Sequence, residues 1–332
     1  MDGGGHGGAL RGGVIMKAIR VREFGAEDVL RIEDVPEPSP GEGEVLVALK
    51  AVGVNPVESY IRTGAYTSEP QLPYTPGTDA AGVIEAAGAG VDAWWPGDRV
   101  YVYGTSTGAY AQKCVCKAWQ AHPLPEGVDF AAGAAMGVPA GAAWRSLYIR
   151  GEARAGETVL VHGATGSVGQ AAVELARASG LTVIGTSSTE QGRRDLLATG
   201  AHHAVNHAAW DDIRGRTGGK GVDLILEMLA NKNLMGDLTI LKPRGRVVVI
   251  GSRGKLEFDP RATLATELDI RGESLGNMTE EENIAMHQAL SAALASGVLK
   301  PHIGARLAMA QAPEAHRAVM SGNTIGKIVL IP

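Results

Sequence analysis

Cysteine is scarce in this chain, and its scarcity limits both cross-linking and metal chemistry. Only Cys114 and Cys116 occur among the 332 residues. They alternate on an expected strand, so they share one face and lie too close in sequence for a normal disulfide. Two thiols also cannot build a four-thiolate structural zinc lobe. We therefore expect ordinary half-buried strand residues and a reducing, cytoplasmic location.

A strong net charge and long apolar runs are also missing. The formal net charge is −5, so no overall field draws nucleic acid or an anionic membrane surface to the protein. The longest stretch of small apolar residues, 130–144, contains Pro139 and is too short to span a bilayer. Residues 1–15 are glycine-rich and lack the apolar core of a signal peptide. We expect a disordered tail there, on a soluble protein.

The pattern of strands and helices divides the rest of the chain into two domains. Residues 16–135 contain short runs rich in Val, Ile and Ala between turns, which indicate antiparallel strands. Residues 136–274 alternate strand-like and helix-like segments, which indicates an α/β fold with a doubly wound parallel sheet of the Rossmann type. Residues 275–332 contain a helix near 280–296 and a final strand, GKIVLIP, and we expect them to return to the first domain.

The segment VLVHGATGSVGQ (159–170) has the pattern of a nucleotide-binding turn. Gly163, Gly166 and Gly169 stand between an expected strand and an expected helix. Glycines there permit a tight turn and close approach of the backbone to a pyrophosphate, which the helix N-terminus attracts. Relative to the usual Gly-x-Gly-x-x-Gly spacing the first glycine is offset, and Ala164 takes its place. The alternative is a glycine-rich turn without a ligand, which the repeated strand–helix pattern disfavours.

The next expected strand ends in VIGTSSTEQGRR (183–194), which bears on the choice of cofactor. An NAD site has an Asp or Glu about 20 residues after the glycines, where it accepts hydrogen bonds from the ribose 2′-OH. Here Ser187 and Ser188 occupy that position, and Arg193 and Arg194 follow. Hydroxyl and guanidinium groups suit a 2′-phosphate, whereas a carboxylate would repel it. The arginines have an alternative role on a solvated helix face, but the missing acid favours NADPH.

In order and spacing, five segments resemble the medium-chain dehydrogenase/reductase superfamily: VNPVESYIRTGAY, LPYTPGTDAAGVIEA, LVHGATGSVG, EMLAN and VVVIGSRG. More closely, the chain from Met16 to its C-terminus is similar to the quinone oxidoreductases of the zeta-crystallin type. The resemblance implies a GroES-like, mainly antiparallel β domain, made of 16–135 and 275–332, beside the Rossmann domain. It also implies a homo-oligomer, either a dimer or a tetramer.

The zinc alcohol dehydrogenases of this superfamily hold their metal with a cysteine and a Gly-His-Glu segment in the first domain. In this chain Asn55 stands about where the cysteine would be, and Thr78 and Asp79 replace His-Glu. The three histidines between 202 and 207 lie at an expected strand without a sulfur partner. A catalytic zinc needs three protein ligands, so we expect the metal-free branch and no metal site.

The resemblance also assigns roles to individual residues. It implies that Tyr60 lies beside the nicotinamide and that Asn55 is the nearby polar group, both with catalytic roles; the alternative for each is a hydrogen-bonded loop residue. The remaining cofactor positions that it implies are Thr165, Gly166, Ser167 and Val168 at the pyrophosphate, Ser188 and His207 near the adenosine ribose and its phosphate, Asn231 beside the ribose and pyrophosphate, and Ile250, Gly251, Ser252, Arg253, Glu273, Ser274 and Leu275 on the nicotinamide side.

Without a metal, such an enzyme holds the nicotinamide against an acceptor that needs no Lewis acid. A quinone fits because its extended π-system accepts reducing equivalents. We therefore expect NADPH-dependent reduction of quinones, with cofactor and acceptor meeting in the interdomain cleft. Two alternatives stay open: an NADPH-dependent enone or alkenal reductase, and a non-catalytic NADPH-binding protein with an RNA-binding or structural role. The charge balance and the lack of a basic-aromatic stripe argue against RNA as the main partner.

For assembly of the oligomer, the apolar strand GRVVVIG (245–251) is the expected sheet edge.

The proposed adenosine pocket is tested by Ser188→Asp. We expect weaker binding of NADPH, because the new carboxylate would repel the 2′-phosphate. The measurement is the NADPH dissociation constant of the variant against that of the unchanged protein. Equal affinities would show that the adenosine pocket is misplaced.

Overall fold

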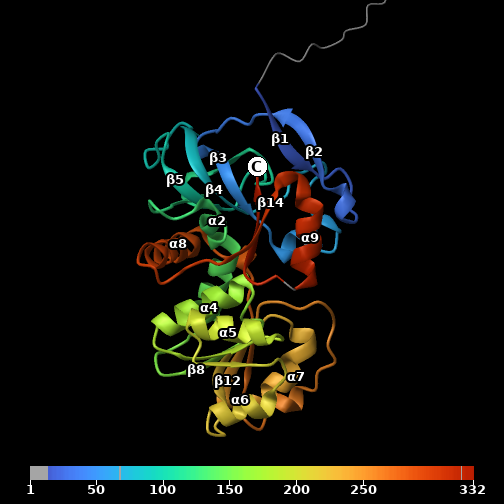
Figure 1. Ribbon diagram of the computed structural model, residues 1–332, viewed down its shortest axis with the longest axis vertical. Coiled ribbons are helices and arrows are strands. Elements are labelled where there is room, and N and C mark those ends of the chain that lie inside the picture. The colour runs from blue at the N-terminus through green and yellow to red at the C-terminus, as the bar shows by residue number, and fades with distance from the viewer. Residues whose placement is uncertain (1–13, 67–68, 323) are drawn as a thin grey trace, which may run out of the picture.

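The computed structural model describes residues 14–66, 69–322 and 324–332. Most of the expected N-terminal tail, residues 1–13, lies outside this range, and the first strand begins at Ile15. The molecule has an upper, mainly β half and a lower α/β half (Figure 1). The chain's last strands and helix return to the upper half beside its first strands, as the sequence predicted.

The upper half is built on a seven-stranded sheet in the order β14-β15-β3-β4-β5-β7, in which β6 pairs with β3. Every strand pair in this sheet is antiparallel except β14 with β15. A separate antiparallel pair, β1 with β2, lies above it. The strands are β1 (Ile15–Arg20), β2 (Arg31–Pro36), β3 (Glu44–Gly53), β4 (Asp79–Ala87), β5 (Arg99–Tyr103), β6 (Lys113–Lys117), β7 (Ala121–Pro123), β14 (Ile303–Ala308) and β15 (Lys327–Ile331).

Two helices of the upper half matter for the site. The first, α1 (Pro56–Arg62), occupies a segment that the sequence pattern suggested as loop and strand. Its start has helix chemistry that the pattern hid: Pro56 takes the first position, and the Glu58 carboxylate accepts the Asn55 N–H at 2.9 Å. The second, α9 (Ala312–Ser321), packs against α1.

The lower half contains a six-stranded, wholly parallel sheet in the order β10-β9-β8-β11-β12-β13. In chain order these strands are 3-2-1-4-5-6, the doubly wound Rossmann arrangement, which confirms the predicted α/β class. The strands are β8 (Thr158–Val161), β9 (Thr182–Thr186), β10 (His203–Val205), β11 (Val222–Glu227), β12 (Leu241–Val249) and β13 (Asp269–Gly272). The helices around them are α4 (Ser167–Ala178), α5 (Glu190–Thr199), α6 (Trp210–Arg216) and α7 (Ala230–Ile240).

The expected sheet edge was wrong. The segment 245–251 belongs largely to β12, which is hydrogen-bonded to β11 on one side and to β13 on the other. Because the short β13 covers it, the exposed edge strands of this sheet are β10 and β13. The apolar character of β12 reflects its place inside the sheet.

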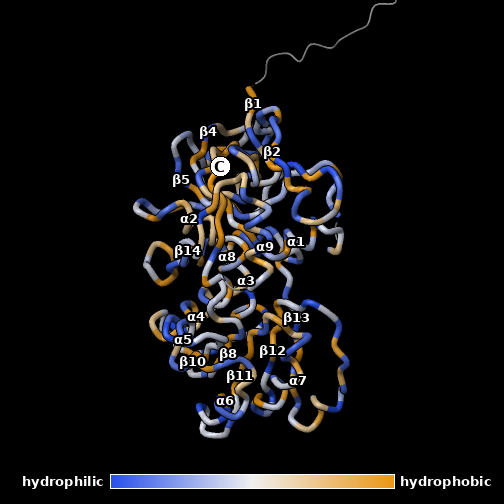
Figure 2. The backbone as a smooth tube through the Cα atoms, turned by 45° about the vertical axis from the view of Figure 1, so that its right-hand side comes forward, coloured by the Kyte–Doolittle hydropathy of each residue, from blue (hydrophilic) through white to orange (hydrophobic). Residues whose placement is uncertain are grey.

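The two halves share one hydrophobic core. A single buried cluster includes Ala81 and Tyr101 of the upper sheet together with Leu147, Val159 and Leu175 of the lower half. Hydrophobic residues follow the strands through the middle of both halves (Figure 2). The connection runs through α2 (Phe130–Gly133) and α3 (Gly141–Trp144), with π-helical turns after each, and the chain returns through α8 (Glu280–Ala295). The predicted domain boundary at 135/136 falls inside this helical connection and stays a prediction.

A buried ion pair lies where the halves join. Asp79 and Lys327 are 0% and 1% exposed, and their Oδ2 and Nζ atoms are 3.0 Å apart. The other oxygen of Asp79 accepts the backbone N–H of Val138 at 2.8 Å, which brings the connecting segment against the upper sheet. A side chain at Gly137 would place its Cβ 2.2 Å from this oxygen, so only glycine fits there. Next to Lys327, the Gly326 N–H donates to the Thr165 carbonyl at 3.0 Å and so joins β15 to the turn after β8.

None of the helices described is long and apolar enough to cross a membrane.

Replacing Lys327 by Met tests the weight of this ion pair. We expect a loss of about 3–5 kcal/mol in the free energy of unfolding, because Asp79 would stay buried without its cation. Lys113→Met is the matched control: Lys113 pairs with Glu37 and Glu85 at a more exposed position, so its loss is expected to be below about 1 kcal/mol. Urea denaturation measures both, and equal small losses would contradict the assigned role.

Candidate active site

The turn after β8 has the backbone geometry of a phosphate-binding loop. Gly163 adopts a left-handed conformation with φ of +53°, and the Gly166 N–H donates to its carbonyl at 3.0 Å. A Cβ at Gly169 would lie 2.5 Å from the Ala164 backbone, so α4 and the turn can approach this closely only with glycine. The helix begins directly at Ser167, and its first N–H groups are free of intrahelical partners by geometry. The backbone N–H groups of one continuous turn are therefore suited to bind an anion; this turn consists of Thr165, Gly166, Ser167 and Val168.

The end of β9 separates the residues that the sequence placed at the adenosine. Ser187 is buried and Ser188, directly after it, is exposed. Arg193 lies against this strand end, since its guanidinium donates to the Ser187 carbonyl at 3.1 Å. Arg194 instead pairs with Glu190 on the exposed face of α5. Of the two arginines that the sequence left open, the structure brings Arg193 to the end of β9.

A second group of predicted residues gathers beyond β11 and β12. Asn231, in the first turn of α7, accepts the Arg253 backbone N–H through its side chain at 3.0 Å. The N–H groups of Ile250 and Gly251 both donate to the Glu227 carbonyl. A Cβ at Gly251 would lie 2.6 Å from the Met228 carbonyl oxygen. The structure thus brings Asn231 and the segment 250–253 together, while their roles at the cofactor stay predictions.

The segment 273–275 follows β13 at the entrance to the connection between the halves. The Glu273 side chain is 4% exposed and lies 3.6 Å from the Arg145 guanidinium. Burial raises the pKa of Glu273 to about 7, and the Arg145 charge opposes this rise. Ser274 precedes a short 3₁₀ turn, 275–277, and Leu275 lies near Gly141 of α3.

The two residues predicted to be catalytic differ in their burial. Asn55 is 2% exposed, and its amide is fully used: the oxygen accepts from Lys327 at 2.5 Å, and the NH₂ group donates to Asp79 at 3.0 Å. Tyr60 is half-buried on α1. The structure therefore makes Asn55 part of the buried network at the junction and leaves Tyr60 partly open to solvent.

A cavity of about 640 Å³ opens beside this network. Its walls include Glu58, Tyr66, Tyr74 and Thr78, and the loop 105–108 closes one side. The Tyr74 hydroxyl is buried and has no hydrogen-bond partner in the described part of the chain. Burial raises the pKa of Glu58 to about 7, while hydrogen bonds from the Asn55 N–H and the Tyr110 hydroxyl oppose the rise. None of the residues 105–108 that line this cavity was predicted from the sequence.

The pKa of Tyr103 depends on residues of the cavity wall and of the segment after β13. Burial raises the pKa of Tyr103 well above its usual range, and the negative charges of Asp79 and Glu273 raise it further. Tyr66, on the cavity wall, also lies close enough to act on Tyr103. Tyr103, at the end of β5, thus lies within electrostatic range of both Tyr66 and Glu273.

Comparison with known proteins identifies the family. A family model described as "Alcohol dehydrogenase GroES-like domain" matches residues 41–126, and one described as "Zinc-binding dehydrogenase" matches residues 167–292. The rat quinone oxidoreductase is 47% identical over 96% of this chain and 98% of its own, and the human quinone oxidoreductase is 45% identical over the same shares. This chain belongs to the quinone oxidoreductase family of the medium-chain dehydrogenase/reductase superfamily.

Solved structures agree with this family assignment. The Escherichia coli quinone oxidoreductase complexed with NADPH has a TM-score of 0.86 and 30% identity, covering 95% of this chain and all of its own. The mycobacterial Rv1454c complexed with NADPH has a TM-score of 0.87 and 31% identity, covering 96% of this chain. The GroES-like domain and the Rossmann domain expected of a quinone oxidoreductase are both confirmed.

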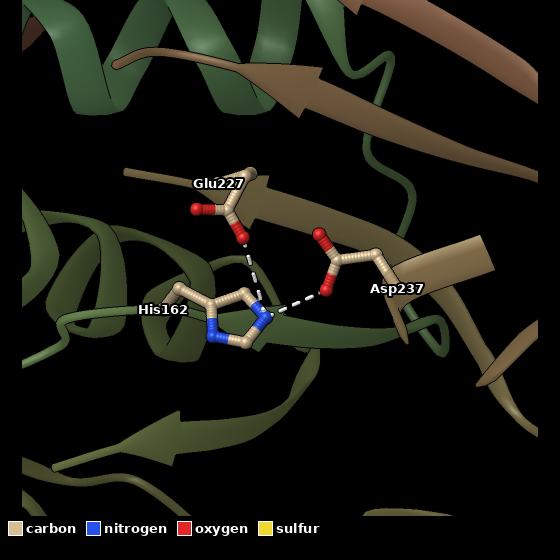
Figure 3. Close-up of side chains that lie close together, drawn as sticks. All are labelled: His162, Glu227 and Asp237. Carbon is tan, nitrogen blue, oxygen red and sulfur yellow. Dashed lines mark hydrogen bonds and ion pairs between the residues drawn. The ribbon is translucent and has the colours of Figure 1, made fainter. Parts of the chain in front are cut away.

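Behind the cofactor turn, this quinone oxidoreductase holds a buried cluster that the sequence did not reveal. His162, directly after β8, points toward Glu227 of β11 and Asp237 of α7 (Figure 3). Among the described residues they are the one group with metal-ligand spacing. The His162 Nε2 and Asp237 Oδ1 atoms are 2.7 Å apart, a direct hydrogen bond that is too short to hold an ion between them. The available signal in the sequence was a carboxylate, Glu227, at the end of the apolar strand β11.

This cluster carries more negative charge than its partners balance. Glu227 Oε2 and Asp237 Oδ2 are buried and accept no hydrogen bond from any residue that the structure describes. Burial raises the pKa of Glu227 and of Asp237, each to about 7, and it lowers the pKa of His162. A proton on one of the carboxyl groups therefore relieves the charge at acidic and neutral pH.

The other histidines that the sequence singled out are used separately. His202 accepts the Val183 N–H at 2.9 Å, and His207 bonds to Thr186 at 2.8 Å.

The buried carboxyl pair makes a prediction about stability and pH. Because folding raises both pKa values, the stabilisation is complete below about pH 4 and is lost as the pH rises through about 7. Asp237→Asn removes one of these protons and keeps the shape of the side chain. We expect a shallower fall in stability between pH 5 and 8, by up to about 1.4 kcal/mol per pH unit.

Urea denaturation of both proteins at each pH measures this difference. Asp212→Asn, on the exposed face of α6, is the control and should leave the pH dependence unchanged. Parallel curves for the unchanged protein and Asp237→Asn would contradict the assignment.

Proposed function

We propose that this protein reduces quinones with NADPH and needs no metal for the reaction. The observation that carries the proposal is the 47% identity to the rat quinone oxidoreductase along almost the full length of both chains. Two solved relatives, named above, are described as complexed with NADPH. The residues of this chain support each part of the reaction, as the next paragraphs argue.

The Rossmann half supplies a site that fits NADPH. The glycine turn leaves no room for a side chain at Gly169, and α4 directs its N-terminus at the place where the pyrophosphate belongs. No carboxylate stands at the end of β9, where Ser188 and Arg193 offer a hydroxyl and a cation for the 2′-phosphate. Asn231 with residues 250–253, and then 273–275, continue the path to Tyr60. When bound there, NADPH supplies the hydride equivalent.

The cavity beside Thr78 is the proposed acceptor site. Tyr66 and Tyr74 line this cavity and offer aromatic surface for a flat quinone ring. For Asn55, the proposed role is to support the site from within the protein. Because its amide bonds inside the protein, its contribution is to hold Lys327 and Asp79 in position.

A catalytic zinc finds no matching ligands here. Asn55 and Thr78 stand where the zinc dehydrogenases have cysteine and histidine, and neither an amide nor a hydroxyl is a usual zinc ligand. The quinone's conjugated system removes the need for a Lewis acid.

We also propose a cytoplasmic homo-oligomer, a dimer or a tetramer. Of the two edge strands of the lower sheet, β13 is the better candidate for the contact, since Ile270 on it and Leu264 just before it are exposed large hydrophobic residues.

The first measurement is the initial rate of NADPH and NADH oxidation by the chelator-treated protein, with an ortho-quinone or a simple enone as acceptor. We expect faster quinone reduction with NADPH than with NADH, and no effect of chelation. Higher rates with the enone would make the protein an enone reductase. Bound NADPH without turnover of either acceptor would favour a non-catalytic role, and loss of activity on chelation would overturn the metal-free proposal.

A further inference from the structure

The hydroxyl of Thr186 lies at a junction between three parts of the cofactor site. Thr186 is the last residue of β9 and is fully buried. Its Oγ1 accepts the N–H of Gly163, the first glycine of the phosphate turn, at 3.1 Å. The same atom lies 2.8 Å from His207 Nδ1 and 3.5 Å from His162 Nδ1. A single hydroxyl therefore contacts the phosphate turn, the buried cluster and the residue after β10.

This contact sets the orientation of the His207 ring. His207 is an exposed residue, and its ring nitrogen Nδ1 is used by Thr186. Burial lowers the pKa of His207, so the ring is neutral and carries one proton. When the Thr186 hydroxyl donates to Nδ1, the ring proton has to be on Nε2. Nε2 makes no hydrogen bond to any described residue, so it is left as an N–H donor for something outside the chain.

The position of His207 indicates what that donor meets. Val205, the last residue of β10, accepts the Ser187 N–H at 3.0 Å, so His207 lies beside the end of β9. Ser188 and Arg193 lie at the same strand end. In doubly wound folds the end of the second strand is where the adenosine ribose and its 2′ substituent bind.

We propose that Thr186 is a positioning residue for cofactor choice: its hydroxyl holds His207 with Nε2–H toward the 2′-phosphate and so favours NADPH over NADH. This inference rests on the proposed function, because it requires a dinucleotide at this turn. The charged oxygens of the 2′-phosphate accept a stronger hydrogen bond from His207 Nε2–H than the neutral 2′-OH of NADH accepts. Thr186 touches neither cofactor directly.

The test compares Thr186→Val, which keeps the shape and loses the hydroxyl, with Thr186→Ser, which keeps the hydroxyl. Dissociation constants for NADPH and NADH are measured by nicotinamide fluorescence, without any acceptor. We expect Thr186→Val to weaken NADPH binding roughly 10-fold and NADH binding less than about 2-fold. Thr186→Ser should retain the preference for NADPH of the unchanged protein.

A double-mutant cycle with His207→Ala separates this role from simple support of the fold. If Thr186 acts through His207, Thr186→Val adds nothing to His207→Ala. Equal losses for NADPH and NADH would overturn the inference, because they would mean that the hydroxyl only supports the turn through Gly163. Fully additive effects, or a protein that binds both cofactors equally before any substitution, would also overturn it.

Two further measurements distinguish failure of this inference from misfolding of the variant and from failure of the proposed function. If Thr186→Val does not fold, the tautomer of His207 in the NADPH complex is read by ¹⁵N NMR; a proton on Nε2 is expected, and one on Nδ1 would overturn the inference. If the protein binds NADPH but reduces no quinone, the proposed function fails, while the ratio of the two dissociation constants still decides the role of Thr186.

Discussion

The buried ion pair between Asp79 and Lys327 joins two strands of the upper sheet where the connection to the lower half packs against it. A carboxylate out of water needs donors on both oxygens. Asp79 finds them on three separate segments: Asn55 before α1, Val138 in the connection, and Lys327 on the last strand. Each donor has only one position that satisfies the charge, so the pair fixes how these segments meet.

The same pair stands between the cofactor turn and the acceptor cavity. Lys327 follows Gly326, which bonds to the phosphate turn at Thr165. Asp79 follows Thr78, which lines the cavity. A side chain at Gly53 would lie 2.7 Å from Lys327 Cε, so the strand packing around the cation is also tight. The proposed cofactor turn and the proposed acceptor cavity thus both lie beside charges that the fold itself requires.

The lower half also contains a network of buried polar groups. Thr186, His162, Glu227 and Asp237 lie inside a sheet and helix layer that is otherwise apolar. Their hydrogen bonds extend to Gly163 and His207, which follow the carboxyl ends of β8 and β10, and to Leu229 and Asn233, which follow β11. A doubly wound sheet places ligands at these ends, because each strand leads there into a loop or helix N-terminus. Polar groups inside the sheet can therefore set the geometry of a site without touching its ligand.

The sequence predicted those elements that depend on residues close together in the chain. The glycine turn from Gly163 to Gly169, the order of strands and helices and the return of the last segment were all confirmed. The start of α1 was missed, because Asn55, Pro56 and Glu58 signal a helix cap within a stretch that otherwise has strand composition. The sheet edge was misplaced because an apolar strand has the same composition at an edge as in the interior.

By itself, the sequence determined the fold class, the position of the phosphate turn and the absence of an acid at the end of β9, since each depends on residues a few positions apart. Only the tertiary structure decided that Asn55 meets Lys327, that His162 meets Asp237, and that Arg193 rather than Arg194 faces the cofactor end of β9. The first two pairs are 272 and 75 residues apart. Their contacts arise from burial and charge balance within the packed structure, which no local pattern records.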